Sequence, residues 1–423
     1  MVVVEQAFFL VAAIIFIGYF GFMFFSKTKI SETLMLLAIG LLIGPGLNLL
    51  GPTEIGVFEG FLPFFASFAL MIILFEGGMQ LNFFKTLRSL SGTFLFTLGV
   101  FFATLALIAA AWFVFTQDLM TGLLLGAILG GTSSEVILPL VKLTSAKEIT
   151  KNLLALESAL TDALCAILAL AFAGVIALSA AGATGTVSFL GIGGDVIGAF
   201  SIAAVLGVVF GLVWLNVMPF FEKRQYEYLV TLAVLMLLYS VAQALGGSGA
   251  IAALVFGIVL GNSEDLTSML RLSSRKVDQE VKSFQGEVSF LVRTLFFVYL
   301  GILFKPSYLG DTVVILMAVL IMAGIMVSRF AGAKIMAAFN KEFGEDTKFI
   351  TFLNARGLSS AALISFPAIV GLGLGLAFER MVALVFIIIM LTNIASSISV
   401  FFVERSQRKR AAFRKLSLPI KDY

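Results

Sequence analysis

The chain has 423 residues, of which 60% are hydrophobic and only 13% are charged, and its formal net charge at pH 7 is +3. Together with repeated apolar runs of about 20 residues, this composition is typical of a helical protein that crosses a membrane many times, and it excludes a soluble enzyme. The sequence contains no histidine and a single cysteine, Cys165, which excludes imidazole metal sites, histidine acid–base catalysis and an intramolecular disulfide.

The apolar runs predict an all-α polytopic membrane protein with about thirteen transmembrane helices. In chain order, the predicted spans cover residues 6–25, 32–50, 61–82, 93–116, 119–142, 151–180, 189–219, 227–245, 247–262, 286–305, 311–337, 348–373 and 381–403. The first run has no lysine or arginine ahead of it, so we interpret it as a spanning helix rather than a cleaved signal peptide. The longest polar connection, residues 262–286, is predicted to be an amphipathic cytoplasmic linker.

The basic residues predict how the spans are oriented. With the N-terminus outside, most of the 28 lysines and arginines fall in inside loops or in the tail at 404–423, whereas the outside connections hold only Lys305 and Arg380. This bias predicts a multi-pass protein of the cell membrane with its C-terminus in the cytoplasm. The basic tail is interpreted as a solvated positive-inside anchor, with contact to anionic lipid as the alternative.

Two similar motifs in distant spans predict an inverted repeat. The fifth span contains Gly-Thr-Ser-Ser at 131–134 and the twelfth contains Gly-Leu-Ser-Ser at 357–360, and a proline, Pro139 or Pro367, follows each motif. The predicted topology makes these two spans run in opposite directions. Inverted repeats whose helices are interrupted by glycine and proline point to the substrate site in secondary transporters. We therefore expect two broken, crossing helices, spans 5 and 12, that line a cavity.

The sixth span carries a polar cluster made of Glu157, Ser158, Thr161 and Asp162. Ionisable groups at bilayer depth are costly and are usually kept for a transport pathway or a partner charge. Asp162 is predicted to be a carboxylate that alternately binds a proton and a cation; the alternative is a carboxylate held by an arginine. Ser158 lies four residues before Asp162, so the two side chains share one helical face.

Neutral oxygens near this carboxylate are predicted to complete a cation site, because hard cations such as sodium prefer oxygen ligands. The predicted cation- and proton-binding residues are Asp162, Thr161, Ser158, Thr132 and Ser133. The predicted ligands of a transported sodium ion are Asp162, Ser158 and Thr132. The alternative role for the hydroxyls is ordinary packing between helices. No cofactor is expected, because the 44 phenylalanines are scattered through the spans and are interpreted as packing residues.

Six further charges are predicted to be structural or relay groups: Glu157, Arg356, Glu76, Arg293, Arg329 and Glu135. We expect Glu157 to pair with Arg356, and Arg329 to be a snorkelling or paired structural charge. Glu76 is predicted to be either an acid that relays protons or attracts cations at the mouth of a funnel, or an interfacial structural acid.

The residues leave the roles of Arg293 and Glu135 open. Arg293 either neutralises the crossing of the two broken helices, competes with the cation for an acid, or pairs with Glu76 or Glu135. Glu135 follows the break in the fifth span and is either a second cation ligand or the partner of an arginine.

Four stretches together resemble the monovalent cation:proton antiporter superfamily, and most closely its NhaP-like sodium/proton exchangers. They are LFEGGMQL around Glu76, GAILGGTSSEVILPL around Thr132, ESALTDA around Asp162 and NARGLSSAAL around Arg356. The chain departs from the family pattern twice. Relatives commonly carry Asn-Asp or Asp-Asp where Thr161-Asp162 stands, and NhaP-like members often carry Thr-Asp-Pro where this chain has Thr132-Ser133-Ser134.

The resemblance implies a division of the chain into domains. Residues 1–82 and 227–305 would form a dimerisation domain, residues 93–180 and 311–403 a mobile core transport domain, residues 189–219 a linker helix, and residues 404–423 the cytoplasmic tail. The core would move past the dimerisation domain and expose Asp162 to each side of the membrane in turn. With one clearly free carboxylate, one proton for one cation is the simplest cycle.

These observations predict a secondary active antiporter that exchanges sodium, or another monovalent cation, for protons and serves pH homeostasis. A potassium/proton antiporter is the main alternative and a cation channel is a further one, whereas the missing histidine and the lack of a recognisable nucleophile with a base disfavour a membrane-embedded enzyme. The expected partners are sodium, potassium or lithium ions, protons, the lipid bilayer and a second copy of the chain in a homodimer, with no nucleic acid.

Overall fold

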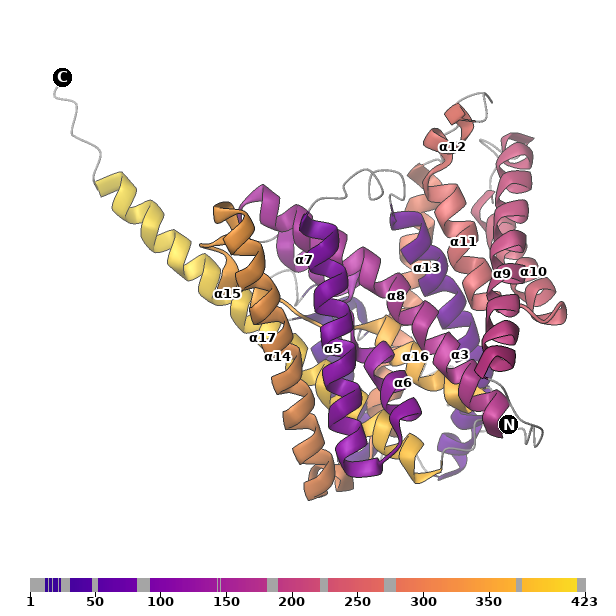
Figure 1. The fold of residues 1–423 in the computed structure, drawn as a ribbon, viewed down its shortest axis with the longest axis horizontal. Coiled ribbons are helices and arrows are strands. Elements are labelled where there is room, and N and C mark those ends of the chain that lie inside the picture. Colours follow the sequence, from indigo (N-terminus) through magenta and orange to yellow (C-terminus); the bar gives the residue numbers. More distant parts are fainter. Residues whose placement is uncertain are drawn as a thin grey trace.

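The structure is a computed structural model that describes residues 31–47, 52–81, 92–142, 144, 146–180, 189–220, 227–269, 279–369 and 375–416, together with separate positions between 12 and 23. Every regular element in these ranges is a helix (Figure 1). The α-helices are α2 (Glu32–Leu41), α3 (Pro52–Gln80), α5 (Gly92–Thr116), α6 (Leu119–Leu129), α7 (Ser134–Lys142), α8 (Glu148–Ala180), α9 (Phe189–Val217), α10 (Glu227–Ala244), α11 (Gly249–Gly261), α12 (Ser263–Met269), α13 (Gln279–Leu303), α14 (Thr312–Phe339), α15 (Thr347–Phe352), α16 (Leu358–Ile369) and α17 (Leu376–Leu416). A π-helical turn, η1 (Leu42–Gly46), continues α2, and the 3₁₀ turns are η2 (Met218–Phe220), η3 (Pro306–Leu309) and η4 (Lys341–Phe343).

The described part of the chain contains seven helices that are long and apolar enough to cross a membrane. They cover Gly92–Thr116, Leu119–Lys142, Glu148–Ala177, Ile197–Val217, Gly286–Leu303, Thr312–Phe339 and Leu376–Phe401. Shorter apolar helices run over Glu32–Gly46, Phe64–Gln80, Tyr228–Ala244 and Gly249–Gly261. The predicted class, an all-helical polytopic membrane protein, is confirmed. The number of thirteen spans stays a prediction, since most of the predicted span at 6–25 lies outside the described residues.

Two predicted spans each consist of two helices with an extended segment between them. The helix α6 ends at Leu129 and α7 begins at Ser134; later in the chain, α15 ends at Phe352 and α16 begins at Leu358. Below, residues 130–133 are called the first extended segment and residues 353–357 the second extended segment. The ends of the segments still bond to the adjoining helices, as the amide of Leu353 does to the carbonyl oxygen of Phe349, but the backbone groups between those ends need partners elsewhere in the protein.

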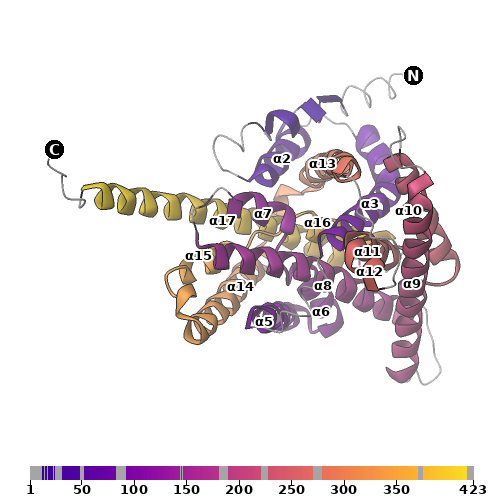
Figure 2. The ribbon, with the colours of Figure 1, turned by 90° about the horizontal axis from the view of Figure 1, so that it is seen from above.

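The C-terminal helix is longer than the sequence predicted. The last span was expected at 381–403, followed by a solvated basic tail, but α17 continues without interruption to Leu416. Its C-terminal half extends away from the helical bundle in both views (Figures 1 and 2). The run 404–416 contains arginine, lysine, glutamate, alanine and leucine, which are among the stronger helix formers, so its composition favours continuation of the helix.

Two groups of helices pack into the bundle. The helices α5, α6, α8, α14 and α15 contact one another around the two extended segments, and α3, α9, α10 and α11 form a second group in which α11 packs against α3 and α9. Figure 2 shows α9 and α10 along one edge of the molecule, with α14 and α15 toward the other. The helix α3 touches both groups, since it also contacts α8 and α16.

Close approach between α3 and α11 depends on glycines. A Cβ atom added to Gly257 would lie 2.2 Å from the carbonyl oxygen of Phe75, and one added to Gly78 would lie 2.2 Å from that of Leu254. Gly261 faces the carbonyl oxygen of Met79 at 2.3 Å in the same way. Small residues let membrane helices approach backbone to backbone, and a methyl group here has only carbonyl groups to displace.

We expect Gly257→Ala to lower the melting temperature of the purified protein in detergent, because α3 and α11 must separate to admit the methyl group, at a cost of about 1–3 kcal/mol. The matched control is Gly99→Ala in α5, where an added Cβ has nothing within 4 Å. Thermal unfolding of the two variants beside the wild type checks the prediction. Equal melting temperatures for both variants would show that the interface is not tightly packed.

Candidate functional site

The two extended segments lie against each other and satisfy each other's backbone groups. The amide of Ser133 donates to the carbonyl oxygen of Ala355 at 2.9 Å. In return, the Arg356 guanidinium donates through Nε to the carbonyl oxygen of Leu129 at 3.1 Å, and the Ser360 hydroxyl donates to that of Ile128 at 2.7 Å. The last carbonyls of α6, which lose their helical partners where the helix stops, therefore receive donors from the second extended segment and α16.

A glycine in each Gly-x-Ser-Ser motif allows the extended segments to lie close to their neighbours. A Cβ added to Gly357 would lie 2.2 Å from Oγ of Ser133, and one added to Gly131 would lie 2.7 Å from Sγ of Cys165 and 2.8 Å from Cβ of Thr161. The glycines of the Gly-x-Ser-Ser motifs thus occupy positions where backbone meets a neighbouring element, so any larger residue would push the segments apart.

Helix α17 holds the second extended segment from the other side. Thr392 Oγ1 accepts the amide of Arg356 at 3.2 Å, and Ser396 Oγ accepts the amide of Asn354 at 3.0 Å. Asn393 donates through Nδ2 to the carbonyl oxygen of Arg356 at 2.7 Å. These polar residues of α17 are buried in an otherwise apolar helix, and their spacing places them on one side of it.

Asp162 lies where the first turns of α7 and α16 meet α8. Its Oδ2 accepts the amide of Ser134 at 2.9 Å and the Ser134 hydroxyl at 2.6 Å, and its Oδ1 accepts the Ser359 hydroxyl at 2.7 Å. The residue is 9% exposed. No lysine or arginine nitrogen among the described residues lies within 4.0 Å of the carboxylate. Its negative charge is instead met by hydroxyl dipoles and by the N-terminal ends of two helices, where the backbone dipoles favour an anion.

A small cavity adjoins this carboxylate. Its volume is about 10 Å³, close to the smallest space that holds one water molecule. It is lined by residues of the first extended segment and of α3, α7, α8 and α16: Ile73, Leu74, Glu76, Gly77, Gln80, Ser133, Ser134, Glu135, Asp162, Ala163 and Ser359. The predicted groups Asp162, Ser133, Glu135 and Glu76 therefore border one space.

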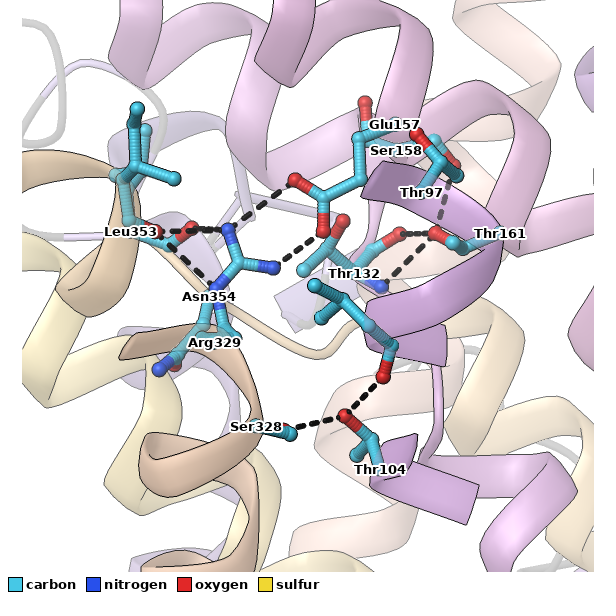
Figure 3. A network of polar contacts seen from close by, with 12 residues as sticks. Thr97, Thr104, Thr132, Glu157, Ser158, Thr161, Ser328, Arg329, Leu353 and Asn354 are labelled. Atoms are coloured by element: carbon cyan, nitrogen blue, oxygen red, sulfur yellow. Dashed lines mark hydrogen bonds and ion pairs between the residues drawn. The ribbon is translucent and has the colours of Figure 1, made fainter. Parts of the chain in front are cut away.

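The other predicted neutral ligands have different contacts. Ser158 donates to the carbonyl oxygen of Ala155 at 3.1 Å, within its own helix, and the hydrogen bonds to Asp162 come from Ser134 and Ser359 instead. Thr161 Oγ1 accepts the amide of Thr132 at 3.1 Å and so attaches the first extended segment to α8 (Figure 3). The hydroxyl of Thr132 is buried and makes no hydrogen bond to any described residue. Although Ser158 and Asp162 share one helical face, the Ser158 hydroxyl does not bond to the carboxylate, because a serine hydroxyl within a helix bonds readily to a preceding carbonyl.

Glu157 pairs with Arg329 of α14, so the expected pair with Arg356 was wrong. Arg329 contacts both carboxylate oxygens, with Nη1 on Oε1 and Nη2 on Oε2 at 3.2 Å (Figure 3). Its remaining donors reach the carbonyl oxygens of Ile350, at 2.8 and 3.2 Å, and Leu353, at 3.0 Å. Both side chains are almost fully buried, and the arginine joins α8, α14 and α15. Arg356 points to backbone carbonyls instead, including that of Asn354.

Arg293 of α13 lies between two carboxylates. One of its nitrogens is 3.8 Å from Glu135 of α7 and the other is 3.8 Å from Glu32 of α2. Glu135 thus has an arginine partner, one of the two roles left open. The Arg293 guanidinium also lies 6.0 Å from the centre of the Phe290 ring. Glu76 is bonded to the hydroxyl of Ser289 and to Nε2 of Gln80, the latter at 3.1 Å.

Sequence reasoning missed three of these residues. In the sequence, Ser134 and Ser359 stand out only as parts of the repeated motif, although each stands at the start of a helix directly after a break, a position that signals an anion at the helix N-terminus. Glu32 stands at the predicted start of a span. Nothing in its local sequence indicates Arg293, which is distant in the chain.

Comparison with known proteins identifies a family and several relatives that match most of this chain in sequence. The family described as "Sodium/hydrogen exchanger, transmembrane" matches residues 11–404. The K(+)/H(+) antiporter NhaP2 of Shewanella oneidensis is 29% identical over 355 residues, which cover 82% of this chain and 58% of that protein. The K(+)/H(+) antiporter NhaP of Alkalimonas amylolytica is 26% identical over 316 residues, which cover 72% of this chain and 51% of that protein. The chain therefore spans less than two thirds of the length of these relatives.

A solved structure shares the fold. The sodium proton antiporter MjNhaP1 from Methanocaldococcus jannaschii, determined at pH 8, matches with a TM-score of 0.75 at 21% sequence identity, over 95% of this chain and 98% of that chain. The resemblance to NhaP-like proteins that four short stretches indicated is thereby confirmed over nearly the full sequence. Since the family match runs from residue 11 to residue 404, the chain belongs to the transmembrane sodium/hydrogen exchanger family.

Proposed function

We propose that the protein is a secondary active antiporter that exchanges a monovalent cation for protons by alternating access, with Asp162 as the shared binding group. The observation that carries this proposal is the state of the Asp162 carboxylate. It is buried, borders a cavity and has no basic partner within 4.0 Å in the described part of the chain, but it receives three hydrogen-bond donors.

Such a carboxylate suits exchange of one ligand for another. A bare anion at bilayer depth is costly, so the states in which it holds a proton or a cation are favoured over the empty state. Both ligands use the same oxygens, which makes their binding mutually exclusive. Because no described arginine lies within 4.0 Å of this carboxylate, ligand binding breaks no ion pair in the described part of the chain.

The backbone around Asp162 supports a transport role. The first turns of α7 and α16 approach the carboxylate from the two Gly-x-Ser-Ser motifs, which the predicted topology orients in opposite directions. We propose that these are the two discontinuous, crossing spans of an inverted repeat, because irregular backbone at membrane depth occurs where it is covered by protein or lines a cavity.

For the moving parts, we propose that residues 93–180 and 311–403 form the core transport domain, that residues 1–82 and 227–305 form the scaffold through which two chains dimerise, and that residues 189–219 connect them. The helices α3 and α13 of this scaffold contact α16, and α3 also contacts α8. The cavity at Asp162 lies on this boundary, since Glu76 and Gln80 of α3 line it together with core residues. Motion of the core against α3 would therefore change access to the carboxylate.

Sodium is the first candidate for the exchanged cation, and potassium is the second. The structural neighbour carries the name of a sodium proton antiporter, whereas the relatives in Shewanella and Alkalimonas carry the name of K(+)/H(+) antiporters. We propose Asp162, Thr132 and Ser133 as ligands from the predicted set, because the buried Thr132 hydroxyl has no hydrogen-bond partner among the described residues. Thr161 would act indirectly by fixing the backbone of Thr132.

Asp162→Asn is expected to abolish exchange, because an amide neither takes up a proton at neutral pH nor carries the charge that binds a cation. The assay is a pH-sensitive dye inside proteoliposomes, read after addition of sodium, potassium or lithium salts. Asp118→Asn is the matched control: Asp118 caps α6 outside the site by accepting from the amides of Met120 and Thr121, and asparagine caps equally well.

Proton movement in the Asp162→Asn variant at the wild-type rate would overturn the site assignment. The same assay separates an antiporter from a channel. An antiporter shows cation flux that saturates and stops without a proton gradient or counter-cation, whereas a channel passes cations without any proton movement.

Glu157→Gln is expected to destabilise the protein by about 3–5 kcal/mol, because it leaves the buried Arg329 without its counter-charge. Replacing both residues, as Glu157→Gln with Arg329→Gln, should restore part of the loss. Thermal unfolding in detergent measures this, with Glu148→Gln as control, since Glu148 is exposed and its pair with Lys151 lies at the surface. If Glu157→Gln unfolds like the wild type but loses coupling, the ion pair belongs to the transport path instead.

A further inference from the structure

A hydrogen bond from Ser359 links Asp162 to the second half of the chain. The Ser359 hydroxyl lies 2.7 Å from Oδ1 of Asp162, although 197 positions separate the two residues in the sequence. Ser134, from the first half, engages the other oxygen at 2.6 Å. The carboxylate is therefore held between hydroxyls from α7 and α16, and both hydroxyls border the cavity.

The neighbouring serine in the same motif has another function. Ser360 is as deeply buried as Ser359, but its hydroxyl donates to the carbonyl oxygen of Ile128 at 2.7 Å and it does not line the cavity. The two consecutive serines therefore have different contacts. Ser360 donates to a carbonyl at the end of α6, and Ser359 donates to the Asp162 carboxylate.

We propose that Ser359 is a ligand of the transported cation and that its position determines how the site chooses between sodium and potassium. This inference rests on the proposed function and adds a residue to it. A serine hydroxyl has one donor and two acceptor positions, so the hydrogen that Ser359 now gives to Asp162 can rotate away and its oxygen can face a cation seated at that carboxylate. A neutral oxygen of this kind suits a hard monovalent ion.

Selectivity follows from the way the site is assembled. Discrimination between cations depends on cavity size and on the number and rigidity of the oxygen ligands. Here the cavity has about 10 Å³ of space, and the ligands come from separate elements whose spacing is fixed by the contacts of the two extended segments. Ser359 closes the side that belongs to α16, so removing its oxygen changes both the ligand number and the size of the site.

The first test compares Ser359→Ala with Ser360→Ala in proteoliposomes, with the half-saturating concentration and maximal rate measured separately for sodium, potassium and lithium. For Ser359→Ala we expect the half-saturating concentration of the preferred cation to rise about tenfold, as for the loss of one neutral oxygen contact, and the sodium-to-potassium preference to change at least about threefold. Ser360→Ala should leave this preference unchanged, because its hydroxyl does not face the cavity.

If Ser359→Ala impairs folding, two other substitutions of Ser359 still test the proposal. Ser359→Thr retains a hydroxyl oxygen and should retain the wild-type order of cations. Ser359→Cys keeps the volume but replaces the oxygen with sulfur, a poor ligand for a hard cation, and should behave like alanine. A structural role alone would lower the rates for all three cations by one factor and leave the preference unchanged, and that result would overturn the proposal.

A binding measurement separates this inference from the proposed function. A cation that binds the folded protein raises its melting temperature in proportion to the logarithm of its concentration above the dissociation constant. We expect sodium or potassium chloride to raise the melting temperature of the wild type and of Ser360→Ala, beyond the effect of choline chloride, and to do so much less in Ser359→Ala. Wild-type protein that shows this shift without proton exchange would refute the antiporter but support Ser359 as a ligand. An equal shift in Ser359→Ala would overturn the ligand assignment.

Discussion

The hydrogen bonds that replace a counter-ion at Asp162 are the interaction on which the rest of the site depends. Helix α8 carries two buried acids five residues apart, and their surroundings differ sharply. Glu157 is bound by both Nη atoms of Arg329, which also donates to backbone carbonyl oxygens, so the charge of Glu157 is compensated by an arginine. Among the described residues, the hydrogen-bond donors to Asp162 are all neutral. The first arrangement fixes three helices to one another, and the second leaves a negative charge for a ligand to neutralise.

These donors exist because the helix pairs α6–α7 and α15–α16 are interrupted beside each other. A continuous α6–α7 would consume the amide of Ser134 in its own ladder, and a continuous α15–α16 would leave no room for Gly357 beside Ser133. The cost of the interruption is a set of backbone groups that must be bonded elsewhere. Arg356, Ser360 and the polar face of α17 supply those bonds, which explains why so many buried polar residues gather in an apolar bundle.

Composition and local pattern were sufficient to predict the helical membrane class, and they singled out Asp162 and the two Gly-x-Ser-Ser motifs, although the inverted repeat and the transport role of Asp162 stay predictions. These features depend on residues that are neighbours in the sequence. The partner of Glu157 was predicted wrongly because Arg329 and Arg356 are both intramembrane arginines, and only the three-dimensional arrangement decides which of them faces α8. The role of Ser359 was missed for the same reason: its partner is far away in the chain, and the motif alone does not distinguish it from Ser360.

The boundary between the proposed core and scaffold is bonded differently from the core itself. Within the core, Arg329 makes a two-point ion pair and further bonds to carbonyls. At the boundary, Arg293 of α13 stands 3.8 Å from Glu135 of the proposed core and 3.8 Å from Glu32 of its own scaffold, and among the described residues its Nε and one oxygen of each glutamate lack a hydrogen bond. Long contacts shared between two carboxylates lose little energy when one partner shifts, since the other remains in reach. In the proposed mechanism the core slides past the scaffold, which requires charges at the boundary that are balanced without being locked, and Arg293 between its two acids fits that requirement.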